Sequence, residues 1–201
     1  MNKDKFLTLH ALAIKKFAGV AAVADLIGAT ESELVGNLQA IVAEGAAITA
    51  RGAFMLTPAG HQTLQAEYPA QFAQLRTDAG LMRGYDEFES VNRQFKQLVT
   101  DWQTVPVAGE VIANDHSDPD YDARIIDRLG ELHERAAPVL ARFAQPVPRL
   151  QRYLERLETA LDKVENGETQ FVSGAKIDSY HTVWFELHED LLRILARERD
   201  E

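Results

Sequence analysis

The first 68 residues carry short apolar patterns with the periodicity of helices. Apolar side chains recur three and four positions apart, as on one face of a helix, and this predicts one helix over residues 4–17 and a second over residues 20–27. Gly28 follows the second pattern, and glycine commonly ends a helix because it adopts positive φ without strain. The chain is therefore expected to begin with two short helices.

A third helix is marked by its start signal. Thr30 and Glu33 have the spacing of a capping box, in which each side chain satisfies a backbone N–H group of the first turn. The apolar stripe that follows predicts a helix from Thr30 to Glu44, closed by Gly45. With that stripe turned inward, the outward face carries small or uncharged side chains, namely Ser32, Val35, Gly36, Gln39 and Ala43.

A strand pair and a fourth helix complete this segment. The apolar runs at residues 46–49 and 53–57 flank Arg51 and Gly52, where glycine takes the positive φ of a tight turn, and this predicts a two-stranded hairpin. Proline is well tolerated in the first turn of a helix, so the proline that follows the hairpin predicts a fourth helix over residues 58–68.

Longer helical patterns begin at about residue 69. Four stretches have an apolar stripe at helical spacing, which predicts four long helices: residues 85–103, 117–144, 146–167 and from about residue 178 onward. Residues 104–114 are expected to be a connection with two hydrophobic patches. The sequence thus predicts a mainly α chain of two domains, with helices and a hairpin in residues 1–68 and an all-α bundle in residues 69–201.

The composition narrows the class of protein. Of the 201 residues, 46% are hydrophobic and 26% charged, as in an ordinary globular chain. The start of the chain has scattered lysines, and the most apolar segment, AGVAAVADLIGA, is too short to cross a bilayer, so a cytoplasmic protein without a membrane partner is expected. With no cysteine, the chain has no disulfide, thiol nucleophile or thiolate metal site.

The charge is unevenly distributed along the chain. Residues 1–68 hold five Lys/Arg and six Asp/Glu, a net charge of −1, whereas residues 69–201 hold sixteen and twenty-five, a net charge of −9. A nucleic-acid-binding chain commonly shows a basic stripe. Residues 1–68 are less acidic than the rest of the chain, but they do not form a basic segment.

Motifs for catalysis are absent from the sequence. No nucleophile motif, phosphate-binding loop or metalloprotease motif occurs, so we expect neither an enzyme nor a bound cofactor or metal. The enzymatic alternative is an acid–base pair, formed by His181 or His188 with Asp178 or Glu189. The run NDHSDPDYD has aspartates at alternate positions, as calcium loops do, but a helix start with Asp118 as N-cap and Pro119 in the first turn explains it better.

Two stretches of the first segment form a more specific pattern. They are VAAVADLIGATESELVGNLQAIVAEGAAI and GAFMLTPAGHQTL, in which AEGAAI enters the hairpin and LTPAG leads to the next helix. This pattern resembles the winged helix-turn-helix of MarR-like bacterial transcription regulators. The resemblance implies a regulator that binds double-stranded DNA as a homodimer, with the third helix in the major groove. The helical second domain would serve dimerisation or the sensing of a small-molecule effector.

The resemblance assigns roles to individual side chains. The expected DNA-binding residues are Lys15, Lys16, Ser32, Gly36, Gln39 and Arg51. Gln39 suits an adenine edge and Ser32 a base or a phosphate, while the cations would neutralise phosphates. Lys15 and Lys16 could instead offset the dipole at a helix C-terminus. The same uncharged face would also suit packing against a protein, so the alternative function is a winged-helix interaction module that does not bind DNA.

The last predicted helix carries two histidines seven residues apart. His181 and His188 lie on one helical face with Trp184 between them, and Tyr180 is adjacent. Because buried imidazoles need hydrogen-bond partners, this face is predicted to point inward and to line a ligand-binding polar pocket. Two alternatives remain: histidines hydrogen-bonded at the edge of a core, or a metal site that includes His133, which would resemble the metal-binding effector domains of some GntR-family regulators.

Overall fold

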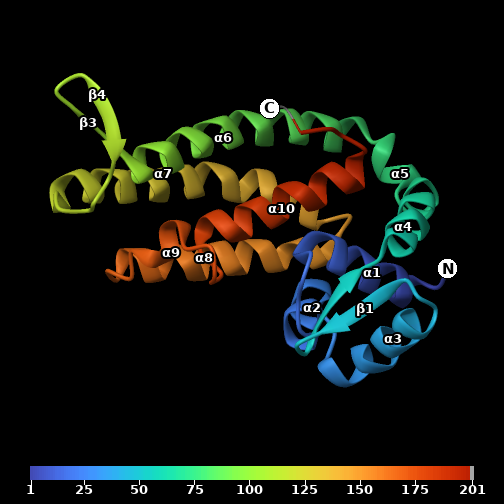
Figure 1. Cartoon of the computed structure of the whole chain (residues 1–201). Helices are drawn as coiled ribbons and strands as arrows, with labels where there is room; N and C mark the ends of the chain where they lie inside the picture. Colours follow the sequence, from blue (N-terminus) through green and yellow to red (C-terminus); the bar gives the residue numbers. More distant parts are fainter. Residues whose placement is uncertain (200–201) are drawn as a thin grey trace. The chain divides into compact units, whose positions relative to one another are not determined.

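The computed structural model describes residues 1–199, which fold mainly as α-helices with two small antiparallel hairpins (Figure 1). The predicted mainly α class is therefore confirmed. The chain divides into two compact units, one formed by Met1–Asp78 together with the segment from His188, and the other by Ala79–Leu187. The predicted division into a domain of residues 1–68 and a domain of residues 69–201 stays a prediction. Among the helices of residues 1–199, none combines the length and apolar character needed to span a bilayer.

Three helices open the first unit, close to their predicted positions. They are α1 (Lys3–Lys15), α2 (Val20–Ile27) and α3 (Glu31–Ala43). Gly28 ends α2 in the left-handed conformation. At the start of α3 the Thr30 hydroxyl accepts the backbone N–H of Glu33, and the Glu33 carboxylate accepts the backbone N–H of Thr30. The capping box is confirmed.

The first hairpin follows α3. Its strands are β1 (Ala47–Ala50) and β2 (Ala53–Leu56). Their antiparallel register leaves Arg51 and Gly52 as the two turn residues, with φ values of 51° and 79°. Two consecutive positive φ angles are what a type I′ turn requires. Ala18, just after α1, bridges to Phe54, so a short third segment pairs with β2.

The helix after the hairpin begins at a close backbone approach. α4 (Pro58–Gln71) is capped by Thr57, whose hydroxyl accepts the N–H of Gly60. A Cβ added to Gly60 would clash with the carbonyl oxygen of Ala46 and lie 2.9 Å from its carbonyl carbon. Only glycine therefore fits where the first turn of α4 meets the chain entering β1. The short helix α5 (Ala73–Arg76) follows.

The end of the chain returns to the first unit. The helix α10 (Tyr180–Leu195) crosses the division, and from His188 onward it belongs with α1 to α5. Nε and Nη2 of Arg76 donate to the carbonyl oxygens of Ile194 and Arg193, both at 3.0 Å. These carbonyls lie in the last turn of α10, where no helical N–H group is left to bond them, so Arg76 caps the helix.

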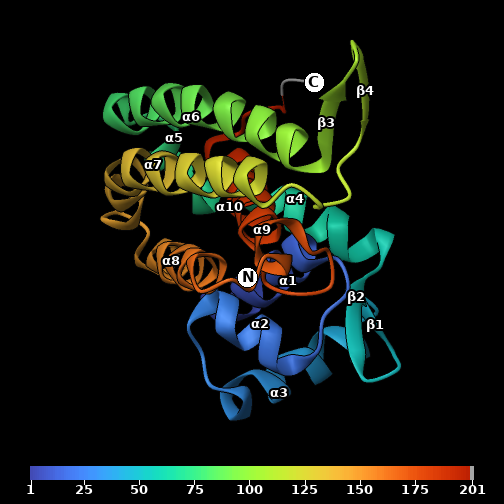
Figure 2. The same ribbon diagram turned by 90° about the vertical axis from the view of Figure 1, so that its left-hand side faces the viewer.

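The second unit is an array of helices resembling a bundle. They are α6 (Ala79–Gln103), α7 (Pro119–Ala144), α8 (Gln151–Glu165), the short α9 (Gln170–Ser173) and the first half of α10, with a 3-10 turn at Pro148–Leu150. α6 and α7 lie side by side in both views (Figures 1 and 2). Large aromatic side chains fill much of the core, among them Phe88, Phe95, Trp102, Phe143, Tyr153, Tyr180 and Trp184.

The connection expected at residues 104–114 is a second hairpin. Its strands are β3 (Thr104–Val107) and β4 (Glu110–Ala113), which pair antiparallel across a turn at Ala108 and Gly109. The hairpin extends from the ends of α6 and α7 (Figures 1 and 2). The expectation of an all-α second half is therefore wrong. The β-branched residues and Gly109 are a hairpin signal, but Pro106 weighs against a strand because proline donates no ladder hydrogen bond.

Two glycine-to-alanine variants in helices of the first unit should have opposite effects on stability. Gly60→Ala should lower the free energy of unfolding by about 1–3 kcal/mol, because the new Cβ forces α4 away from Ala46. Gly36→Ala should raise it by about 0.5–1 kcal/mol, because a Cβ at this exposed position of α3 meets nothing within 4 Å and alanine favours the helix. Urea unfolding of both variants measures this. Equal effects would contradict the described packing of α4.

Candidate functional site

The face of α3 predicted to contact DNA is exposed. Ser32, Gly36 and Gln39 are all exposed, whereas Leu34 and Leu38 between them are buried. The face offers a hydroxyl and an amide for hydrogen bonds, and its glycine leaves the middle of the helix open. This arrangement lets a partner approach the backbone of α3 closely. DNA contact by these residues stays a prediction.

The predicted phosphate-binding cations lie at two turns. Arg51 is exposed in the β1–β2 turn, and Lys16 is exposed at the end of α1 with a φ of 64°. Lys15 is half-buried, and its carbonyl accepts the N–H of Phe17 at 2.7 Å, which closes the turn around Lys16. A non-glycine residue with positive φ is strained by about 1–2 kcal/mol. The pairing of β1 with β2 and the hydrogen bond that closes the turn after α1 offset this strain.

An exposed apolar row lies on the outer face of the first hairpin. Ile48 and Met55 are directly paired and are 49% and 39% exposed. Phe17, 50% exposed, directly precedes Ala18, which bridges to Phe54, the neighbour of Met55 in β2. The sequence does not predict this row, because alternation over four residues does not tell which face of a hairpin stays uncovered.

In the second unit, the predicted ligand-binding side chains of α10 belong to a packed polar and aromatic network. Trp184 is buried against Phe88 and donates from Nε1 to Oδ1 of Asn92 at 2.9 Å. Tyr180 is fully buried, and its hydroxyl lies 3.2 Å from Nδ1 of His133. Burial raises the pKa of the Tyr180 hydroxyl, which keeps it protonated and able to donate. The structure thus joins His133 to this helix through Tyr180.

The two predicted histidines of α10 have different surroundings. His181 is half-buried, with its ring 6.0 Å from that of Phe95, and burial lowers the pKa of its imidazole. His188 is buried in the first unit, where Nη1 of Arg199 lies 3.4 Å from its Nδ1. A ligand role for these histidines stays a prediction. Within residues 1–199, no three His, Asp or Glu side chains gather as a metal site would require.

The aspartate run before α7 forms a helix cap. The Asp118 carboxylate accepts the backbone N–H groups of Asp120 and Tyr121, both at 3.0 Å, and Pro119 occupies the first position of α7. The predicted helix start is confirmed. The Asp122 carboxylate accepts a hydrogen bond from Nδ2 of Asn114 at 3.0 Å, which links the residue after β4 to the first turn of α7.

A buried polar cluster in the first unit was not predicted. His10 on α1 and Asp190 on α10 are both fully buried, with His10 Nε2 2.8 Å from Asp190 Oδ1. The other ring nitrogen of His10 lies 2.9 Å from the hydroxyl of Tyr68 on α4. Tyr68 in turn accepts a hydrogen bond from Arg193. One consistent assignment has Arg193 donating to the Tyr68 oxygen, the Tyr68 O–H to Nδ1, and Nε2–H to the Asp190 carboxylate.

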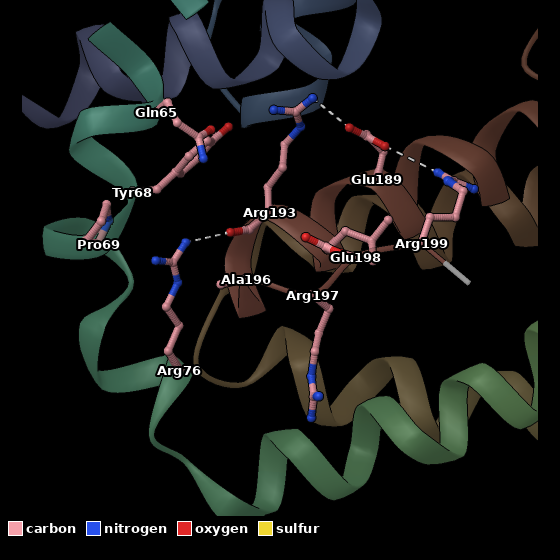
Figure 3. A pocket seen from close by; sticks show the side chains of 11 residues that line it. Gln65, Tyr68, Pro69, Arg76, Glu189, Arg193, Ala196, Arg197, Glu198 and Arg199 are labelled. Carbon is pink, nitrogen blue, oxygen red and sulfur yellow. Dashed lines mark hydrogen bonds and ion pairs between the residues drawn. The ribbon is translucent and has the colours of Figure 1, made fainter. Parts of the chain in front are cut away.

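This cluster borders a pocket of about 390 Å³ lined by α4, α5 and the end of α10 (Figure 3). Four of its lining residues are arginines, Arg76, Arg193, Arg197 and Arg199, and two are glutamates, Glu189 and Glu198. The Glu189 carboxylate accepts from Arg193 Nη2 at 2.6 Å through one oxygen and from Arg199 Nη2 at 3.2 Å through the other. Burial lowers the pKa of Arg193, but Tyr68 and Glu189 outweigh it, and the net shift is upward.

The sequence contained part of the signal for this cluster. His10 and Asp190 interrupt apolar stripes of their helices, and a polar residue on a buried face needs a polar partner. The pattern does not identify that partner, because the two residues are 180 positions apart. Comparisons of the chain with protein-family models, curated proteins and solved structures find no match. The geometry of the described residues therefore carries the functional assignment.

Removing one member of the buried pair should destabilise the protein more than removing both. His10→Leu leaves the Asp190 carboxylate buried without its imidazole partner, and the free energy of unfolding should fall by about 3–5 kcal/mol. The double variant His10→Leu with Asp190→Leu should regain part of this loss. His61→Leu, at an exposed histidine, is the control and should have little effect. Urea titrations at pH 7 test this, and additive losses would contradict a coupled pair.

The second unit should lose stability as the pH falls through about 6.5, the ordinary pKa of histidine. Burial lowers the pKa of both His133 and His181 in the folded protein. The unfolded chain therefore binds protons at higher pH than the folded chain, so stability is fully present above about pH 6.5 and decreases below it. In His133→Asn with His181→Asn, the urea midpoint should change less between pH 7.5 and 5.5 than in the unsubstituted protein. His61→Asn should keep the original dependence.

Proposed function

We propose that this protein is a DNA-binding transcription regulator whose first unit is a winged helix-turn-helix acting as a homodimer. One observation carries the proposal. The helix that follows the short α2–α3 turn presents an exposed, uncharged face, and a hairpin with an arginine at its tip follows it directly. In the proposed fold, α3 enters the major groove and the β1–β2 hairpin is the wing.

The chemistry of this face sets the mode of DNA binding. Gln39 suits an adenine edge and Ser32 a base or a phosphate. Arg51, Lys16 and Lys15 supply the phosphate contacts, so each subunit has few of them. The carboxylate of Glu33 near the start of α3 is bonded to Thr30, which lowers its pKa and holds it in the cap. Because three cations per subunit give modest affinity, a second subunit on the same site is part of the proposal.

The rest of the chain then takes on the regulatory roles. The helical second unit serves dimerisation and senses an effector, for which Tyr180, His181 and Trp184 remain the proposed ligand-binding residues. His188, which belongs to the first unit, is proposed as a ligand-binding residue there. The protein is proposed to work in the cytoplasm and not to be an enzyme. These assignments use the analogy with other winged helix-turn-helix proteins. Since one fold can carry different functions, the experiments below test them directly.

A second candidate function has its own support. The apolar row of Phe17, Met55 and Ile48, together with exposed Val35 on α3, is the kind of surface that docks on a protein. In this case the first unit is an interaction module that does not bind DNA.

The salt dependence of DNA binding should reveal the proposed phosphate contacts. A triple variant with Lys15→Ala, Lys16→Ala and Arg51→Asn lacks the three proposed phosphate-binding cations. It should bind all DNA sequences more weakly. It should also reduce the slope of log K against log salt by roughly 0.9 for each phosphate that the variant no longer neutralises. Asparagine is chosen at position 51 because it tolerates the positive φ of the turn. Anisotropy titrations with genomic promoter fragments at several salt concentrations measure both effects.

Two further variants complete this experiment. Lys176→Ala with Arg135→Ala removes two exposed cations of the second unit and should leave the slope unchanged. Gly36→Arg adds a cation to the open face of α3, which DNA should tolerate and a closely packed protein should not. If the unsubstituted protein binds no fragment even at low salt, the DNA proposal fails. The interaction module is then favoured if Gly36→Arg abolishes binding of a partner protein.

A further inference from the structure

The pocket beside the buried cluster has a charge opposite to that of the whole chain. Four arginines and two glutamates line it, whereas the chain carries a net charge of −10. Arg76, Arg193 and Arg199 come from three different segments, namely α5, α10 and the residues after α10. Figure 3 shows Arg76 against the backbone at Arg193, and the side chains of Arg193 and Arg199 on two sides of Glu189. A pocket lining with more arginines than carboxylates favours an anion in a chain that otherwise repels one.

Arg76 has N–H groups that form no hydrogen bond within residues 1–199. A guanidinium carries five N–H groups, and Arg76 gives one from Nε and one from Nη2 to the carbonyls at the end of α10. Both acceptors are neutral, and within residues 1–199 no carboxylate pairs with Arg76. Its positive charge at the pocket wall is therefore not part of an ion pair in the described part of the chain.

Arg193 supplies a second unmet donor. Its Nη2 donates to Glu189, but its Nε is buried and has no hydrogen-bond partner within residues 1–199. A buried N–H group of a charged side chain is costly to leave unpaired, so an acceptor other than these residues is expected at this point. Because this Nε has almost no accessible surface, an oxygen atom of an anion in the pocket reaches it only after a small shift of the Arg193 side chain.

The remaining wall limits the size and character of the occupant. The aromatic ring of Tyr68, with Pro69 and Leu192, gives the pocket an apolar side. Its volume of about 390 Å³ lies at the lower end of the range for small-molecule sites. The occupant would thus combine one oxyanion group, for the arginines, with a short apolar body.

We propose that this pocket binds a small organic oxyanion, a carboxylate or a phosphate monoester, through Arg76 and Arg193. The site is distinct from the α3 face and from the network around Trp184. The hydrogen bond from Arg193 to Tyr68 leads on to His10 and so to Asp190. Binding of the oxyanion therefore stabilises the contact of α1 with the end of α10, which gives an effector a path into the first unit.

Binding is measured on the full chain in the absence of DNA, so its failure is separate from failure of the DNA proposal. Sodium phosphate, phenyl phosphate and benzoate are titrated against sodium chloride at constant ionic strength, with the melting temperature and calorimetric heat as readouts. At least one oxyanion should raise the melting temperature saturably, because it binds the folded state. A response to phenyl phosphate alone or to benzoate alone tells which oxyanion is bound.

Variants connect the binding to the two arginines. Arg76→Gln and Arg193→Gln should each weaken binding by at least about tenfold, the equivalent of one charge-assisted hydrogen bond. Arg76→Lys and Arg193→Lys keep the positive charge and lose the planar fork, so they should fall in between. Arg135→Gln, at an exposed arginine of the second unit, should bind normally. Circular dichroism first establishes which variants are folded. Where a glutamine variant is not folded, the lysine variant at the same position takes its place in the comparison.

Two results overturn the proposal. One is a melting temperature that changes with each oxyanion only as it does with chloride, without saturation. The other is saturable binding that all the folded Arg76 and Arg193 variants retain with unchanged affinity, since the anion would then lie elsewhere.

Discussion

The hydrogen bond between His10 and Asp190 joins residues 180 positions apart, and neither side chain is exposed. An imidazole and a carboxylate can be buried together only if their polar atoms find partners, because desolvation of each group is otherwise unfavourable. Their pairing holds the last turns of α10 beside α1 within the first unit. The Tyr68 contact, the Arg76 cap and the arginine-lined pocket all depend on that placement of α10.

One helix therefore carries two polar networks. In its first half, Tyr180 and Trp184 meet His133 and Asn92 in an aromatic core. In its second half, Asp190 and the neighbouring Arg193 take part in the cluster around His10 and Tyr68. Buried polar networks of this kind specify a unique packing when every member is satisfied. The buried Nε of Arg193, which has no hydrogen-bond partner within residues 1–199, is the exception, and it belongs to a side chain that lines the pocket.

The outer surface of the first unit combines features that favour different partners. The α3 face is uncharged and open, the nearby turns supply a few cations, and the first hairpin exposes an apolar row. A protein with a net charge of −10 gains little general attraction to DNA, so specific contacts and a second subunit would have to provide the affinity. An oxyanion in the arginine-lined pocket would offset the positive charge of the arginines there, which is a direct electrostatic route for an effector to act.

The sequence by itself determined the features that depend on residues close together in the chain. The capping box at Thr30 and Glu33, the turn at Arg51 and Gly52, and the Asp118 cap each involve partners at most three positions apart, and local geometry specifies them. Hydrophobic spacing likewise identified the buried and exposed sides of α3. The hairpin at residues 104–113 is also local, but a proline within four-residue strands obscured it.

Only the tertiary structure decided which distant side chains meet. An isolated histidine or aspartate in an apolar stripe indicates a buried polar group, but many partners are compatible with it. His10 found Tyr68, 58 positions away, and Asp190, 180 positions away, because the packing of α1, α4 and α10 brought them together. The arginine-lined pocket has the same origin. Its cations come from α5, α10 and the segment beyond, and no spacing in the sequence relates them, since their convergence follows from the return of the chain to its first unit.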